Sequence, residues 1–103
     1  MAANPERGEV EIVLGDERGV ICAEMARLAI LSREIGTKSL RELFERLQGV
    51  EVFAMYAAID ALLVEGDAKS LKAEMKTPSD LALVSAAVIQ SLGAFIGDGE
   101  KKP

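Results

Sequence analysis

The residue types that carry most enzyme chemistry are scarce in this chain. Its 103 residues include no histidine and a single cysteine, Cys22. Without imidazole there is no Ser-His-Asp or Cys-His arrangement and no histidine-ligated zinc, and one cysteine cannot build a structural zinc or iron–sulfur site. Cys22 directly precedes the predicted start of a helix at Ala23, a position that lowers a thiol pKa. Packing of a small apolar residue behind a strand explains Cys22 more simply.

The aspartate and glutamate residues do not form a recognisable catalytic or metal-binding group either. Glu9 and Glu11 share one face of a predicted strand, which superficially suggests an acid/base pair. A solvated strand face explains them better, because nothing nearby would raise a carboxyl pKa. Glu65 and Asp67 flank Gly66 but are too few for a calcium loop. We therefore assign no catalytic residue, no cofactor-binding residue and no metal ligand, and we predict that the protein is not an enzyme.

The net charge limits the classes of molecule that this protein is expected to bind. The net charge is −5 and the sequence pI is about 4.7, with no basic patch able to neutralise several phosphates. This argues against binding to nucleic acid or to an anionic membrane. The uncharged stretch 81–97 lies at the lower limit of a membrane span and contains polar residues, so we expect no membrane partner. The polar N-terminus and the lone cysteine favour a cytoplasmic protein.

The composition favours an α+β fold that is mainly α, since half of the residues are apolar but only 4% are aromatic. Val10, Ile12 and Leu14 alternate with more polar neighbours, which predicts a strand. Turn residues over 15–19 and the apolar run 20–22 complete an N-terminal β-hairpin with a loop of about four or five residues. We predict four or so helices after it, in one domain over 1–97, followed by a disordered tail over 98–103.

Helix boundaries follow from capping signals. We predict helices over 23–36 and 39–49, the first ended by Gly36 and the second opened by the capping box of Ser39 and Glu42. A third should span 52–65, and the segment 67–76 is either a short helix or a mobile connection. The apolar residues predicted to face the core of the first three helices are Met25, Leu28, Leu31 and Ile35; Leu40, Leu43, Phe44 and Leu47; and Val52, Tyr56, Ile59 and Leu63.

The last predicted helix is the most apolar, and the rest of the chain must be arranged around it. It begins at Thr77-Pro78-Ser79-Asp80, a hydroxyl cap followed by proline and an acid, and should end at Gly97. One face of this helix has apolar residues at coiled-coil spacing and is our predicted partner-binding surface: Leu81, Val84, Val88, Leu92 and Phe95. The alternative is that this face closes into the core of a monomer. A second stripe consists of small or neutral residues: Ala82, Ala86, Gln90, Gly93 and Gly97.

The order of these pieces resembles a known family. The resemblance rests on these segments: Asn4-Pro5, Arg7-Gly8-Glu9-Val10, Leu14-Gly15, Arg27-Leu28-Ala29 before Gly36, Ser39-Leu40 with Leu43 and Leu47, Ala61-Leu62-Leu63, and Thr77-Pro78-x-Asp80. Over residues 4–96 the chain resembles the small tail-assembly proteins of gene transfer agents and related siphophages, some of which are labelled tail tube proteins.

The resemblance implies a tail assembly chaperone in the bacterial host cell. Such proteins bind the long helical tape measure protein, help the major tail protein to polymerise around it, and are absent from the finished particle. The family has no catalytic residues to carry over. Self-association is a further expectation for an apolar helical surface. Two other readings stay open: a structural tail tube component, and a small regulatory protein-binding domain.

Overall fold

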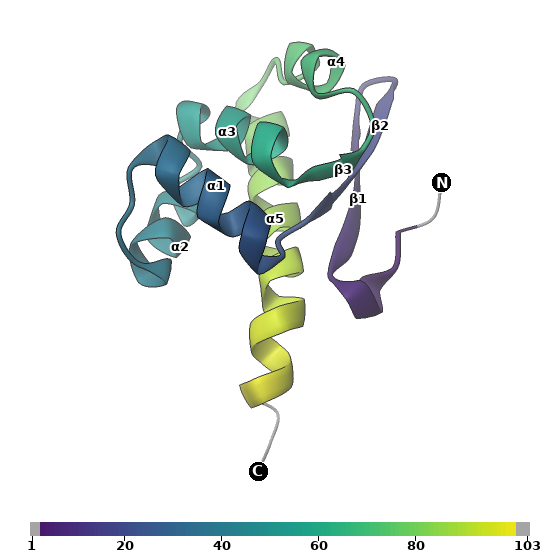
Figure 1. Ribbon diagram of the computed structural model, residues 1–103. Helices are drawn as coiled ribbons and strands as arrows, with labels where there is room; N and C mark the ends of the chain where they lie inside the picture. Colours follow the sequence, from purple (N-terminus) through teal and green to yellow (C-terminus); the bar gives the residue numbers. More distant parts are fainter. Residues whose placement is uncertain (1–2, 101–103) are drawn as a thin grey trace.

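The computed structural model describes residues 3–100, and their side chains except for Pro5 and residues 95–100. A short 3₁₀ helix over Pro5–Arg7 leads into a three-stranded antiparallel sheet and five α-helices (Figure 1). The predicted class, α+β and mainly α, is confirmed. The helices are α1 (Met25–Ile35), α2 (Leu40–Gln48), α3 (Val52–Leu62), α4 (Ala68–Ala73) and α5 (Pro78–Glu100).

The predicted N-terminal hairpin is present, but its turn is tighter than expected. Strand β1 (Glu9–Leu14) pairs with β2 (Glu17–Cys22), and Leu14 lies opposite Glu17. Gly15 therefore begins a two-residue turn and takes a positive φ of 60°. Gly19, which we had assigned to the turn, lies inside β2. A Cβ on Gly19 would come within 2.7 Å of Leu71 Cδ1, so this glycine permits close packing instead of a turn.

A third strand was missed by the sequence prediction. Helix α3 ends at Leu62 and the chain continues as β3 (Leu63–Glu65), which pairs with β2. We had extended the helix through these residues because their apolar run continues its pattern. Their partner is Val20 and Ile21, more than forty positions earlier in the sequence. That long-range pairing overrides the local helical pattern.

Local capping explains the other helix ends. Gly36 ends α1 in the left-handed conformation with a φ of 78°, as predicted. Ser39 accepts a hydrogen bond from the Glu42 N–H at 3.0 Å, and the Glu42 carboxylate accepts one from the Lys38 N–H at 2.8 Å. The segment 67–76 contains the short helix α4, whose cap Asp67 accepts a bond from the Ser70 N–H.

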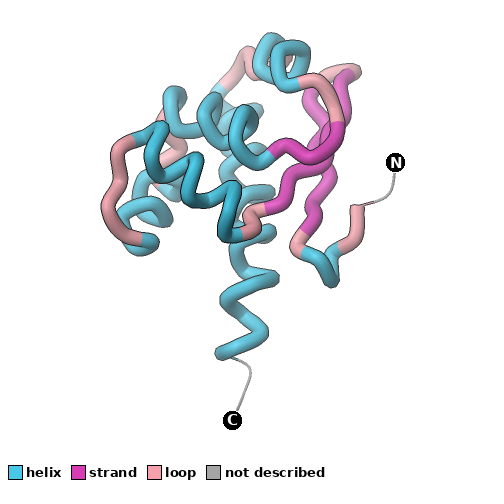
Figure 2. The backbone as a smooth tube through the Cα atoms, in the orientation of Figure 1, coloured by secondary structure: helices cyan, strands magenta, loops and turns pink. Residues whose placement is uncertain are grey.

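Helix α5 runs through the middle of the molecule and contacts β1, β2, α2 and α3 (Figures 1 and 2). The sheet lies on one side of its N-terminal half, with α1, α2 and α3 on another, and its C-terminal turns project beyond the other elements. The helix passes through Gly97, where we predicted its end, and continues to Glu100. Of the predicted tail, residues 101–103 lie outside the described residues.

Two buried serines fix α5 against the rest of the chain. The Ser91 hydroxyl accepts a hydrogen bond from the Ala23 N–H at 2.8 Å and donates one to the Gly8 carbonyl. Ser85 donates to the Leu47 carbonyl at the end of α2, at 2.8 Å. Both side chains are buried. Ser91 therefore joins three segments that are far apart in the sequence, at backbone groups that water does not reach.

Replacing Ser91→Ala should lower the free energy of unfolding by about 2–3 kcal/mol, because two buried backbone groups lose their partner. For a chain of this size that corresponds to a fall in Tm of about 10–20 °C. Ser85→Ala should cost only about 1 kcal/mol, since the Leu47 carbonyl keeps a bond from the Val50 N–H. Ser79→Ala, at an exposed position of the same helix, is the control. Equal melting temperatures for all three variants would contradict the assignment.

The start of α5 predicts an acid-dependent loss of stability. Hydrogen bonds from the backbone N–H groups of Lys76 and Thr77, each 3.0 Å long, hold the pKa of Asp80 below its ordinary value of 3.8. Their stabilisation is present above pH 3.8 and is lost as the pH falls through the lowered pKa. Asp80→Asn should therefore flatten the dependence of urea unfolding on pH between about pH 5 and 2. Asp16→Asn, on the exposed hairpin turn, controls for the loss of one carboxylate; an unchanged slope for Asp80→Asn would refute the prediction.

Candidate functional site

Cys22 lies in a protected setting. Its side chain is buried, and Sγ donates to the Arg7 carbonyl at 3.4 Å. Burial raises the pKa of the Cys22 thiol above its ordinary value, and the negative charge of Glu24 adds to this. A raised pKa lowers the thiolate fraction and so the nucleophilicity of the sulfur. The geometry favours the packing role over the reactive one.

The two strand carboxylates are engaged separately. Glu9 Oε1 accepts a hydrogen bond from the Asn4 N–H at 3.0 Å, and Glu11 Oε2 lies 3.2 Å from Arg18 Nη1. Among the side chains that the structure describes, no group of three or more cysteine, aspartate and glutamate residues is arranged to hold a metal ion.

The face of α5 that we predicted to bind a partner is closed by the chain itself. Val84, Val88 and Leu92 are fully buried in the main core, together with residues of β1, α2 and α3. These three residues are therefore not an open surface in the monomer, which is the alternative considered above. Leu81 is only partly buried, and the side chain of Phe95 lies outside the described residues.

The opposite face of α5 is open. Ala82, Leu83, Ala86, Gln90 and Gly93 are exposed along it, and none of them is charged. A Cβ on Gly93 would meet no atom within 4 Å. The predicted stripe of small and neutral residues therefore faces outward, as far as side chains are described.

Several large apolar side chains that we assigned to the core are exposed instead. Met25 of α1 is 74% exposed and Leu40 of α2 is 46% exposed. Val52 and Tyr56 of α3 are also exposed, beside Phe53. The buried face of α3 is rotated away from the predicted one. It keeps Ile59 from the prediction, and its other residues are Ala54, Met55, Ala57, Ala58, Ala61 and Leu62.

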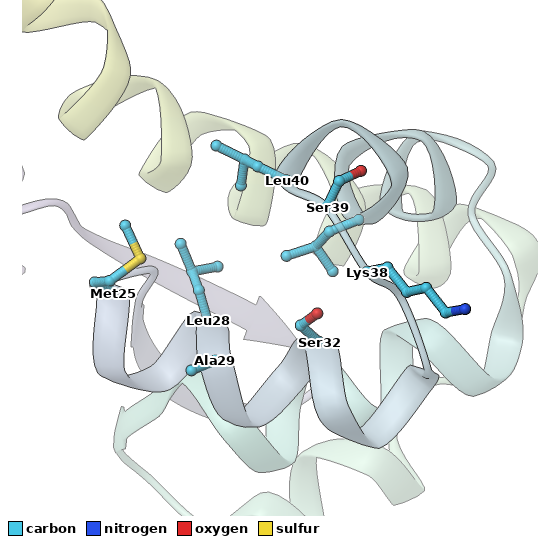
Figure 3. Close-up of a pocket in the computed structure, with 8 residues that line it drawn as sticks. Met25, Leu28, Ala29, Ser32, Lys38, Ser39 and Leu40 are labelled. Carbon is cyan, nitrogen blue, oxygen red and sulfur yellow. The ribbon is translucent and has the colours of Figure 1, made fainter.

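Two of these exposed residues border a depression that we call the α1–α2 groove. It has a volume of about 180 Å³. Figure 3 shows Met25 and Leu28 rising from α1 on the side where Leu40 of α2 lies, with Lys38 at the far end of α1. Its full lining is Met25, Leu28, Ala29, Ser32, Lys38, Ser39, Leu40 and Leu43. The groove is therefore mainly apolar, with one charged side chain at one end.

A second depression, the α3–α5 groove, has a volume of about 230 Å³. Val52 and Tyr56 of α3 line it, together with Leu81 of α5 and the segment 75–78. Both grooves are smaller than the roughly 300–1,000 Å³ typical of small-molecule pockets. Their size suits one or two side chains of another protein, and the grooves are the best candidate site in the described chain.

Comparisons of the chain with family profiles, with curated proteins and with solved structures find no match. Within the described residues, no helix is both long enough and apolar enough to cross a membrane.

The environment of Cys22 gives a direct test of the packing role. We expect the native protein to react with a thiol reagent such as DTNB about a hundredfold more slowly than the urea-unfolded chain at pH 8, because the thiol is buried and its pKa is raised. The absorbance of released thionitrobenzoate follows the reaction. Rapid labelling of the native protein, at the rate of the unfolded chain, would show that Cys22 is an accessible thiol.

Proposed function

We propose that this protein is a non-enzymatic tail assembly chaperone, which binds an apolar helical segment of the tape measure protein and so assists assembly of the tail tube from the major tail protein. The observation that carries the proposal is the exposure of large apolar side chains along two grooves, each of a size for protein side chains. The sequence resemblance supplies the identity of the client.

Physical chemistry supports a role in holding another polypeptide. Exposed apolar side chains that gather around concave surfaces mark sites of protein interaction. Met25, the most exposed of them, has a flexible and polarisable side chain that adapts to different partners. A net charge of −5 keeps such a protein soluble while it presents apolar surface. In this proposal the chaperone acts in the cytoplasm of the bacterial host and leaves before the particle is complete.

The sheet disfavours the alternative of a structural tube component. A tube subunit needs an extended β structure that closes into rings. Here the described sheet has three strands, and β3 contains only three residues. The other alternative, a small regulatory protein-binding domain, would use the same grooves and differs in its partner.

Co-expression tests the proposal. The tape measure protein of the same tail gene cluster should remain in the soluble fraction when it is co-expressed with this chain, and should aggregate when it is expressed alone. The soluble fraction after centrifugation is the measurement, and an unrelated acidic protein of similar size is the control. Aggregation in both cases, with no complex on size exclusion, would reject the chaperone function. Recovery of the chain as a stoichiometric part of purified particles would favour the tube component.

A further inference from the structure

We infer that the α1–α2 groove is the site that holds the client, and that its occupant is an amphipathic helix with acidic residues beside its apolar face. This inference rests on the proposed function for the identity of the client, but the groove and its charge can be tested without it. The site differs from the face of α5 that the sequence pattern suggested, because Val84, Val88 and Leu92 of that face are buried.

The groove has the form of a receptor for a helix. Leu28 and Leu43 line the groove and are buried. Met25 and Leu40 are exposed and lie on opposite sides of it (Figure 3). From Met25 to Ser32 the groove follows α1 for about 10 Å. This length matches about two turns of a bound helix, so two of its side chains, spaced three or four residues apart, would enter together.

The charges at one end of the groove favour an acidic occupant. Most basic side chains elsewhere are paired with carboxylates: Arg18, Arg27, Arg46, Lys72 and Lys76. Of the described basic residues without an ion pair, Arg33 lies near the end of α1, Lys38 in the connection to α2, and Arg41 near the start of α2. Glu34 and Glu42 add two negative charges to the same stretch, and the Glu42 carboxylate accepts a hydrogen bond from the backbone N–H of Lys38. Lys38 itself lines the groove.

Charge complementarity therefore selects among occupants. A partner helix with carboxylates next to its apolar stripe would gain an ion pair at Lys38, the charged side chain in the groove lining, whereas a basic helix would meet a like charge there. A second copy of this chain is the competing occupant of the groove, and the experiment below tests for it.

The probes are two synthetic 18-residue amphipathic helices with the same leucine stripe. One carries glutamates beside the stripe and the other carries lysines at the same positions. Fluorescence anisotropy of labelled peptide at low salt should show the glutamate peptide binding about fivefold more tightly. The preference should shrink at 0.5 M salt, because exposed ion pairs are screened.

Substitutions locate the site. Met25→Glu and Leu40→Glu should each weaken binding of the glutamate peptide about tenfold, since each puts a charge into the apolar contact. Leu83→Glu is the matched control, because Leu83 is exposed to a similar degree, 41% against 46% for Leu40, but lies on α5 outside the groove. Lys38→Glu should reverse the preference in favour of the lysine peptide. Circular dichroism of each variant checks that the fold is kept.

The outcomes separate the two proposals. Equal binding of both peptides, or equal loss with Leu83→Glu and Met25→Glu, would overturn the groove assignment. A wild-type dimer in sedimentation that Met25→Glu dissociates would also overturn it, because a second copy would then occupy the groove. If Met25→Glu still keeps the tape measure protein soluble, the chaperone function stands and its surface lies elsewhere. If the peptides behave as expected but the wild-type chain does not solubilise the tape measure protein, the groove stands and the proposed function falls.

Discussion

The fold depends on the burial of one side of α5 against β1, β2, α2 and α3. Val84, Val88 and Leu92 supply the apolar contact with the sheet and with α2 and α3. Apolar contact alone is non-directional, so it does not fix how far the helix slides along the core. The hydroxyls of Ser85 and Ser91 do so, because each meets a backbone group at one defined place. The two buried serines therefore fix the position of α5 along its axis, which apolar contact alone would not do.

Features set by neighbouring residues were predictable from the sequence. The positive φ of Gly36, the capping box of Ser39 and Glu42, and the acid-capped start of α5 all depend on contacts within a few positions. Long-range features were not predictable in the same way. The strand β3 exists because β2 offers it a partner, and Gly19 is needed because Leu71 packs against β2 from a distant helix.

The candidate site lies where the sequence pattern assigned residues to the wrong side of a helix. Periodicity shows that Met25, Leu40, Val52 and Tyr56 belong to apolar faces, but it does not show which of two apolar faces is covered. In α3 the covered face is rich in alanine, and α1 packs closely against it. The larger residues Val52, Phe53 and Tyr56 are left outside. Apolar side chains in excess of what the core accepts are the surface available for a partner.

The bond from Ser91 to Gly8 joins residues near the two ends of the chain. During synthesis on the ribosome, α5 is the last of these elements to emerge. The hairpin and the first four helices are therefore made before the helix that packs against the core is present. Until then their leucine and isoleucine side chains stay open to water. A protein that we propose to protect others from aggregation therefore exposes its own core side chains to water each time it is translated, until α5 has been synthesised.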